Sequence, residues 1–530
     1  MKGLYGWASP LLLLLLASCG TGAGGAPTPD AGMTNGGDSG SADAAPSDAA
    51  ADSADATAAD SSLPVDSTAP LETGPSDASP DAVEPEEASG PLTASAPGIA
   101  CTDTIANVYM TPQPLPTMTP ALRGAIVRCA VDVVYDVSQV ETEITAKGIV
   151  TPATSGVSFF RIAYRTMRGN GSPGVSTARV YLPTTPLALP LPVIAVGHPT
   201  DGLASACAPS KDLTSNEDLA LPWAGLGYAV IVPDYAGLGN DDPVQGYVDN
   251  HDTGYSMLDA TRALRNFLAP GVLSDQVLLS GWSQGGGAVL SAQALAPTYG
   301  AGGTLAGILV FAAEWPTRMN SFGYVNMLNS PTALTIEQGI SNPVVAVFRQ
   351  YAYDSLYLGP THATDSFPAS NQSGIGGAIA SLCQTPFGGY IQASDVHVSD
   401  FIDDTFRTSL LDCINAGQDA GADAGPCVDP GMSYYAFLQQ NILTADPNGP
   451  PLLYVQGLAD IIMPAASEAA CNIAKLRADG VSPQVCVDPA AQHTNVVGRN
   501  MDFALKWGEA VLSRKPIPTC SAVGMPACTP

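Results

Sequence analysis

A serine that could act as a nucleophile stands in the segment Gly281-Trp-Ser-Gln-Gly285. The apolar run Val277–Leu279 before it has the residue types of a strand, and the small residues after it are compatible with a helix. Glycine on both sides permits a turn so sharp that the Ser283 hydroxyl is left exposed. Because a serine hydroxyl is a poor nucleophile at neutral pH, this segment predicts a nearby base and an acid that orients the base.

A candidate acid and a candidate base follow the serine in the chain. A G-x-S-x-G segment between a strand and a helix is typical of α/β-hydrolases, in which the acid comes next and the histidine last. Asp460 lies on the loop just after a strand-like run at 452–456. Two histidines, His397 and His493, lie well beyond the start of the long stretch that begins at about residue 315, and of these only His493 follows a strand with an acid at its end. We therefore expect Ser283, Asp460 and His493 to form a catalytic triad.

Stabilising the negative oxygen of an acyl-transfer intermediate requires two backbone N–H donors. The N–H of Gln284, directly after the candidate nucleophile, is one expected donor of this oxyanion hole. The other should come from the loop His198-Pro-Thr-Asp-Gly202, which follows a strand-like run. Since Pro199 has no N–H, Thr200 is the expected second donor and His198 is expected to shape the loop.

Strand-like and helix-like runs alternate beyond residue 150, which predicts a mostly parallel sheet covered by helices on both faces, the α/β-hydrolase fold. The expected strands are 158–165, 177–182, 192–197, 228–233, 277–280, 306–311 and 452–456, with a further short run at 485–487. The expected helices include 255–268, 284–295, 466–478 and 500–514.

A long stretch of about 315–448 interrupts this alternation. Structureless loops of that length are uncommon in compact domains, so we expect an inserted cap over the carboxyl edge of the sheet, where such folds bind ligands. A peripheral decoration with no role at the site is the alternative.

The N-terminal residues predict export. The short apolar run Leu11–Leu16 is typical of a signal peptide and too short to span a membrane. It ends in Leu16-Ala-Ser-Cys19, which resembles a bacterial lipobox. That resemblance implies a signal peptide at 1–19, acylation of Cys19, and an outer-membrane or cell-surface lipoprotein held to the membrane by its lipid anchor only. Ordinary secretion with a free Cys19 is the alternative.

Residues 20–100 contain 14 acidic side chains, no Lys or Arg, and very few large apolar residues. Such a segment cannot bury enough surface to offset its ordering entropy, so we expect a disordered acidic tether ahead of a single large domain at 101–530. The formal net charge of −29 argues against nucleic acid as a partner.

Cysteine usage agrees with an oxidising compartment. Eleven cysteines leave an even number once Cys19 is set aside, which indicates disulfides. Sequence cannot fix their connectivity, although local spacing favours the pairs Cys413–Cys427, Cys471–Cys486 and Cys520–Cys528. No Cys-x-x-Cys pair occurs and the five histidines are scattered, so no metal site and no cofactor are expected.

Several ordered segments resemble the secretory lipase family of α/β-hydrolases. They run from Phe159-Phe-Arg-Ile-Ala-Tyr-Arg165 through Cys207-Ala-Pro-Ser210, Pro233-Asp-Tyr-Ala-Gly-Leu-Gly239 and Gly281-Trp-Ser-Gln-Gly285 to Gln456-Gly-Leu-Ala-Asp460. The resemblance implies carboxylic ester hydrolysis, often of acylglycerols, with the triad Ser283, Asp460 and His493. It also implies that Cys207 pairs with a cysteine of the cap, here Cys383. The family commonly has His-Gly-Thr-Thr-Gly where this chain has His198-Pro-Thr-Asp-Gly202, so the loop and the substrate range depart from the pattern.

These observations favour a lipase-like serine carboxylic ester hydrolase that works through a covalent acyl-enzyme. A serine peptidase or amidase is an alternative, because the triad does not distinguish esters from amides. An inactive surface-binding protein with a hydrolase fold is a second alternative, although such a protein usually lacks a member of the triad.

Overall fold

The computed structural model describes residues 94–212, 214, 217–240, 244–317, 328, 341–393, 401–416, 427–520 and 523–529. The predicted signal peptide, Cys19 and residues 20–93 of the predicted tether lie outside them. Within the described part, Ala94 is fully buried and the N–H of Gly98 donates to the carbonyl of Phe267 at 2.8 Å. Residues 94–100 thus include a residue, Ala94, that packs into an apolar core of the domain expected at 101–530.

The described residues form one nine-stranded sheet with the strand order β1-β2-β3-β5-β4-β6-β7-β8-β9. Pairing is antiparallel from β1 to β5 and parallel from β5 through β4 to β9, so the sheet is mostly parallel. The strands are β1 (Ile126–Tyr135), β2 (Val157–Met167), β3 (Pro173–Pro183), β4 (Leu191–Gly197), β5 (Ala229–Ala236), β6 (Leu273–Trp282), β7 (Thr304–Phe311), β8 (Leu452–Gly457) and β9 (Gln484–Asp488). This is the predicted α/β-hydrolase arrangement.

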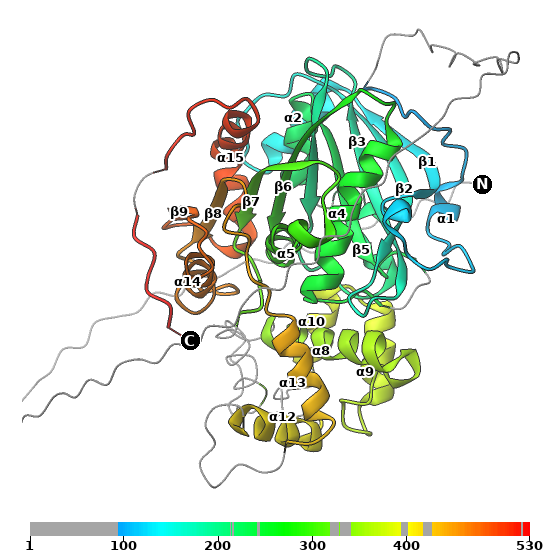
Figure 1. Ribbon diagram of the computed structural model, residues 1–530, viewed down its shortest axis with the longest axis vertical. Coiled ribbons are helices and arrows are strands. Elements are labelled where there is room, and N and C mark those ends of the chain that lie inside the picture. Colours follow the sequence, from blue (N-terminus) through cyan, green and yellow to red (C-terminus); the bar gives the residue numbers. More distant parts are fainter. Residues whose placement is uncertain are drawn as a thin grey trace, which may run out of the picture. The chain divides into compact units, whose positions relative to one another are not determined.

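Helices cover both faces of the sheet, as the alternation of elements predicted (Figure 1). The helices are α1 (Ile105–Val108), α2 (Val137–Ala146), α3 (Glu217–Gly225), α4 (Asn250–Phe267), α5 (Gln284–Tyr299), α8 (Ser341–Tyr353), α9 (Gln372–Ser381), α10 (Gln384–Ala393), α12 (Asp404–Ala416), α13 (Gly431–Gln440), α14 (Ala470–Ala478) and α15 (Val496–Leu512). None of the helices in the described ranges is long and apolar enough to cross a membrane.

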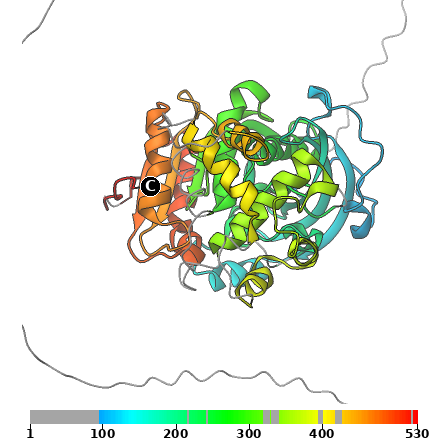
Figure 2. The same ribbon diagram turned by 90° about the horizontal axis from the view of Figure 1, so that it is seen from below.

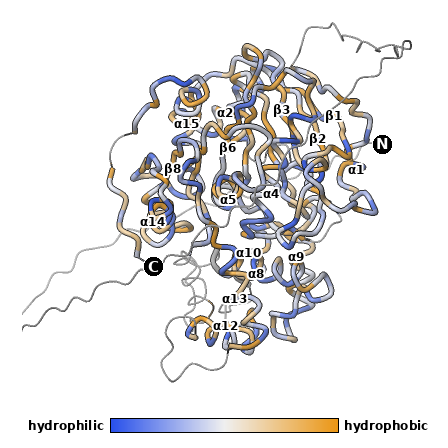
Figure 3. The backbone as a smooth tube through the Cα atoms, viewed as in Figure 1, coloured by the Kyte–Doolittle hydropathy of each residue, from blue (hydrophilic) through white to orange (hydrophobic). Residues whose placement is uncertain are grey.

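The alternation of side chains along the strands produces two apolar cores, one on each face of the sheet. In β2, for example, Phe160 and Ile162 pack into a core shared with α4, α5 and α14, whereas Phe159 packs into a core shared with α2, α3 and α15. The central strands are accordingly hydrophobic along most of their length (Figure 3). Burial on both faces fixes the register of the sheet, because a slip of one residue would exchange the two cores.

The segment between β7 and β8 contains α8, α9, α10, α12 and α13 and has its own apolar core. These helices lie across one end of the sheet (Figures 1 and 2). Leu203, Tyr247 and Val248 of the surrounding hydrolase fold also pack into this third core. The described part of the inserted segment is therefore largely helical, and it shares its apolar core with loops that leave the sheet.

Five disulfides join described residues: Cys101–Cys129, Cys207–Cys383, Cys413–Cys427, Cys471–Cys528 and Cys486–Cys520. The 207–383 bond is the one that the family resemblance implied, and the 413–427 bond is the one that local spacing favoured.

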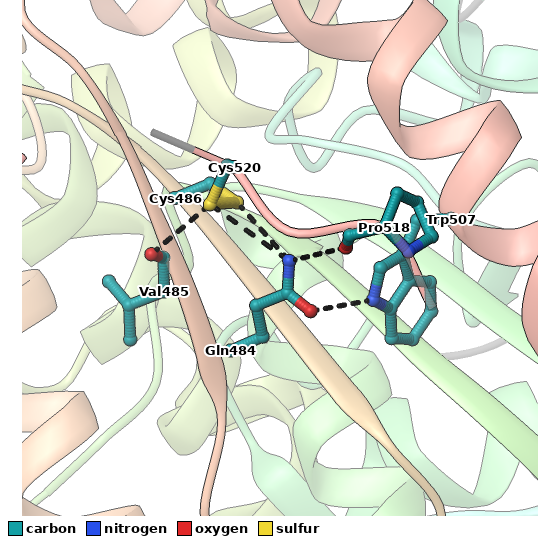
Figure 4. The surroundings of a disulfide bond; sticks show 6 residues. All are labelled: Gln484, Val485, Cys486, Trp507, Pro518 and Cys520. Carbon is teal, nitrogen blue, oxygen red and sulfur yellow. Dashed lines mark hydrogen bonds between the residues drawn. A yellow bond between two sulfur atoms is a disulfide. The ribbon is translucent and has the colours of Figure 1, made fainter. Parts of the chain in front are cut away.

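The predicted pairs Cys471–Cys486 and Cys520–Cys528 are wrong. Cys471 lies on α14, whose apolar residues pack on one face of the sheet, whereas the Cys486 side chain packs into the core on the opposite face. The C-terminal segment instead passes near both, and there Gln484 donates to the carbonyl of Pro518 and accepts from the Trp507 indole beside the Cys486–Cys520 bond (Figure 4).

Candidate active site

Ser283 lies at the junction between β6 and α5, where the chain turns sharply. Its backbone has φ 56° and ψ −122°, a left-handed conformation that residues other than glycine rarely adopt. The turn is held by the N–H of Ser283, which donates to the carbonyl of Phe311 at 3.0 Å, and by the N–H of Glu314, which donates to the carbonyl of Ser283 at 2.9 Å. Strain of this kind persists only where the surroundings impose it, and it is common at active sites.

The flanking glycines are required because backbone segments approach each other here. A Cβ atom on Gly281 would lie 2.1 Å from the carbonyl oxygen of Gly285, and a Cβ atom on Gly285 would lie 2.0 Å from that of Gly197. Both distances are far below van der Waals contact. The second contact also brings the end of β4, and the loop that follows it, against the first turn of α5.

The three predicted triad residues lie within hydrogen-bond distance of one another. The Nε2 atom of His493 is 2.9 Å from the Ser283 hydroxyl, and its Nδ1 atom is 2.8 Å from the Asp460 carboxylate. All three side chains are buried. They come from segments that are far apart in the sequence, since Asp460 follows β8 and His493 opens a short helical turn ahead of α15.

Asp460 is held so that one carboxylate oxygen faces the histidine. Its other oxygen accepts the backbone N–H groups of Ile462 at 2.9 Å and Met463 at 2.8 Å. An ionised carboxylate only accepts hydrogen bonds, so Nδ1 of His493 must carry the proton in this pair. Nε2 is then left as an acceptor for the serine proton, which is the arrangement that a general base requires.

The two expected oxyanion donors lie at the facing ends of β4 and α5. Gln284 is the first residue of α5, and a backbone N–H in that position has no acceptor within its own helix. Thr200 is buried, and its hydroxyl lies 2.8 Å from the Tyr247 hydroxyl.

His198 shapes the loop that carries Thr200. It is fully buried, stacks on Tyr235 and has its Nδ1 atom 3.0 Å from the Asp201 carboxylate. Burial alone would lower the pKa of His198, but the hydrogen bond and negative charge of Asp201 outweigh burial, so the pKa is raised. The Tyr235 hydroxyl also donates to the carbonyl of His198 at 3.0 Å. The loop is thus held from within by the contact between His198 and Asp201, and from β5 by the Tyr235 hydroxyl.

The inserted segment is fastened to this same loop. Cys207, just beyond the loop, is bonded to Cys383 ahead of α10. Gly202 forms an isolated antiparallel bridge with Cys383, and the N–H of Gln384 donates to the carbonyl of Asp201 at 2.8 Å. One covalent bond and a backbone pairing therefore connect the helical insertion to the loop beside Ser283.

Two further polar residues of the site escaped the sequence analysis. Glu314 lies three residues after β7, and Tyr247 precedes α4; the Tyr247 hydroxyl donates to the Glu314 carboxylate at 3.4 Å. Glu314 keeps partial exposure to solvent. Burial raises its pKa, although the positive charges of Arg349 and His493 and the hydrogen bond from Tyr247 act against that rise. The one signal in the sequence was that Glu314 follows a strand whose carboxyl end lies at the same edge as Ser283.

Within the described ranges, no group of three or more His, Cys, Asp or Glu side chains is placed to hold a metal ion. Separately, the hydrogen bond between Ser283 and His493 is an arrangement that can support proton transfer and nucleophilic attack by the serine.

Comparison with known proteins gives a family match and several structural matches. A family model described as secretory lipase matches residues 215–314, the segment that contains Ser283. No curated protein matches the chain.

The solved structures that share the fold include two ester-cleaving enzymes. Candida antarctica lipase A superposes with a TM-score of 0.58 at 18% identity, over 81% of this chain and 91% of that one. The rice cell wall degrading esterase LipA from Xanthomonas oryzae superposes with a TM-score of 0.53 at 20% identity, over 74% and 97%. A hydrolase from Legionella pneumophila, described as putative, gives 0.55 at 16% identity, over 74% and 100%. The chain thus has an α/β-hydrolase fold, and its segment 215–314, which contains Ser283, is similar to the secretory lipases.

Proposed function

We propose that this protein is a lipase-like serine carboxylic ester hydrolase with Ser283 as nucleophile, His493 as base and Asp460 as the acid that orients the base. The observation that carries the proposal is the continuous hydrogen-bonded line from Ser283 Oγ through His493 to Asp460, with distances of 2.9 and 2.8 Å. Ser283 lies on a strained turn between β6 and α5, the position in which α/β-hydrolases present the hydroxyl of their nucleophile.

In the proposed reaction, Ser283 Oγ attacks the ester carbonyl carbon while its proton passes to Nε2 of His493. The carbonyl oxygen becomes negative and accepts the backbone N–H groups of Gln284 and Thr200. His493 then returns the proton to the departing alcohol, which leaves an acyl-serine. Water enters, gives a proton to His493 and attacks the acyl carbon; the carboxylic acid departs as Ser283 recovers its proton.

Esters are preferred over amides as the proposed substrates because the family match and the superposed enzymes are lipases and an esterase. The inserted helical segment is the proposed acyl-binding cap. Its own apolar core and its attachment to the 198–202 loop support that role. Acylglycerols are the proposed natural substrate class, by analogy with the family.

The proposed location is outside the cytoplasm. Five disulfides among the described residues support export, since such bonds persist in oxidising compartments. We further propose that acylated Cys19 anchors the protein at the outer membrane or cell surface. In the native host, Cys19→Ser should release the protein from membranes with its specific activity unchanged, and an unmodified Cys19 thiol in intact-mass analysis would contradict the anchor.

The test of the proposed function compares Ser283→Ala with Ser280→Ala. Ser280 lies on the same strand, is fully buried, and its hydroxyl has no hydrogen-bond partner within the described part of the chain, so its loss should cost little. Hydrolysis of p-nitrophenyl esters from short to long chains should disappear in the first variant and persist in the second. A fluorophosphonate probe should label the native protein at Ser283, as located by peptide mapping.

Two results would redirect the proposal. Undiminished hydrolysis by Ser283→Ala, or labelling at another residue, would refute the assignment of the nucleophile. Faster cleavage of a p-nitroanilide than of the ester with the same acyl group would identify an amidase instead.

A further inference from the structure

The side chains of Thr200, Tyr247 and Glu314 are hydrogen-bonded one to the next. They connect the 198–202 loop to the turn that carries Ser283. The Thr200 hydroxyl lies 2.8 Å from the Tyr247 hydroxyl, which lies 3.4 Å from the Glu314 carboxylate. The backbone N–H of Glu314 donates to the carbonyl of Ser283 at 2.9 Å. Glu314 therefore contacts both the residue that bears the nucleophile and, through one tyrosine, the residue expected to bear an oxyanion donor.

The number of hydroxyl protons decides which group donates and which accepts in each of these hydrogen bonds. A tyrosine hydroxyl has one proton to donate, and an ionised carboxylate can only accept. Burial raises the pKa of Tyr247 well above 10, so its hydroxyl keeps the proton. If that proton goes to Glu314, the only donor left between Thr200 and Tyr247 is the threonine hydroxyl.

A residue of the inserted segment packs against Tyr247 and limits its movement. Tyr247 is buried and its ring packs edge-on against Phe348 of α8, with ring centroids 5.8 Å apart. A fixed tyrosine gives the Thr200 side chain a fixed partner. Holding the Thr200 side chain also limits rotation of the backbone to which it is attached.

We propose that Glu314 is a positioning residue: by accepting the Tyr247 proton, it commits the Thr200 hydroxyl to Tyr247 and so keeps the Thr200 N–H aimed at the oxyanion. This inference rests on the proposed function, in which that N–H stabilises the negative oxygen. The threonine hydroxyl is then a fixing point for the loop and makes no contact with substrate.

The test measures kcat and KM for a soluble p-nitrophenyl ester in Tyr247→Phe, Glu314→Gln, Thr200→Val and their pairwise combinations. The control is Tyr164→Phe, which removes another buried tyrosine hydroxyl, one that donates to the Ser256 carbonyl at 2.8 Å away from the site. Circular dichroism and thermal unfolding establish that each variant is folded.

We expect Tyr247→Phe to lower kcat by about 10- to 100-fold and to change KM by no more than about twofold, because the oxyanion exists only in the transition state. Thr200→Val should lower kcat similarly, and Thr200→Ser should restore most of it. Glu314→Gln should lower kcat because its neutral amide can also donate and no longer imposes a direction. Since all three residues act through the same hydrogen-bonded chain, the kcat of each double variant should be no lower than that of Tyr247→Phe alone. Tyr164→Phe should keep the kcat of the unaltered protein.

Two outcomes would overturn the inference while leaving the proposed function intact. The first is an unchanged kcat in Tyr247→Phe or Thr200→Val. The second is a loss from Glu314→Gln that is equally large in the Tyr247→Phe background, because Glu314 would then act on His493 by its charge. Failure of the unaltered protein to hydrolyse esters or to be labelled at Ser283 would overturn both the proposed function and the inference.

Discussion

The Cys207–Cys383 disulfide should contribute to both stability and turnover. It closes a loop with a sequence separation of 176 residues. In the chain-entropy model, closing a loop of that size removes enough freedom from the unfolded chain to stabilise the fold by up to about 5 kcal/mol. That is as large as the whole stability of many domains, so the double variant Cys207→Ser/Cys383→Ser should unfold at a clearly lower urea concentration.

The effect on turnover has a separate cause. Cys383 pairs with Gly202, and the residue after it donates to the carbonyl of Asp201. Both contacts lie at the end of the loop that carries Thr200. Freed from the bond, this loop can shift, and a displacement of 1 Å at a catalytic group can cost on the order of a hundredfold in rate.

The Cys413–Cys427 bond provides a matched control. Its sequence separation is 14, for which the same model gives about 3 kcal/mol. It joins α12, at the far end of the insertion from the sheet (Figure 1), to the segment just ahead of α13. The double serine variant at 413 and 427 should therefore lose stability and keep kcat.

The assay pairs urea unfolding, followed by tryptophan fluorescence, with kcat for p-nitrophenyl esters under native conditions. The reasoning would be refuted if kcat fell equally in both double variants, since turnover would then follow general stability. An unchanged kcat in the 207/383 variant would show that the loop is held without the bond.

Three further predictions concern single side chains. Asp460→Asn should fold normally but lower kcat by about 10⁴-fold, as measured by ester hydrolysis, because the amide favours the wrong tautomer of His493. Burial raises the pKa of Glu217 from 4.5 to about 8, so its contribution to stability is complete below pH 4.5 and is lost as the pH rises through 8. Between pH 6 and 9, Tm should therefore decline less in Glu217→Gln than in the unaltered protein. An equal decline in both proteins would show that other titratable side chains cause the loss of stability. Gly285→Ala should destabilise the fold by at least about 1–3 kcal/mol in urea unfolding, because its Cβ would lie 2.0 Å from the Gly197 carbonyl.

The proximity of Ser283, Asp460 and His493 could be predicted from the sequence because the signals for the first two are local. Ser283 lies in a short motif between a strand and a helix, and Asp460 directly follows a strand. The structure brings both, with His493, to one site. In such a fold, the carboxyl ends of the parallel strands lie at one edge of the sheet. A motif that directly follows a strand can therefore be placed at that edge from the sequence alone.

Contacts that depend on packing between distant segments were beyond the sequence analysis. Tyr247 and Glu314 are 67 residues apart, and neither lies in a recognisable motif. The pairing of Cys471 and Cys486 failed for the same reason, because proximity in the chain says nothing about which face of the sheet a side chain occupies. Strand β1 was also missed; its exposed valines, Val131 and Val134, give it a weak pattern.

The two outermost strands of the sheet are each bonded to a terminal segment. Cys129 of β1 is joined to Cys101, and the N–H of Asp103 donates to the carbonyl of Cys129 at 3.0 Å. At the other edge, Cys486 of β9 is joined to Cys520. An uncovered edge strand is a template on which another chain can add a strand and start an aggregate. The two terminal bonds thus hold chain segments beside both edge strands, and reducing the disulfides should make the protein prone to self-association through these edges.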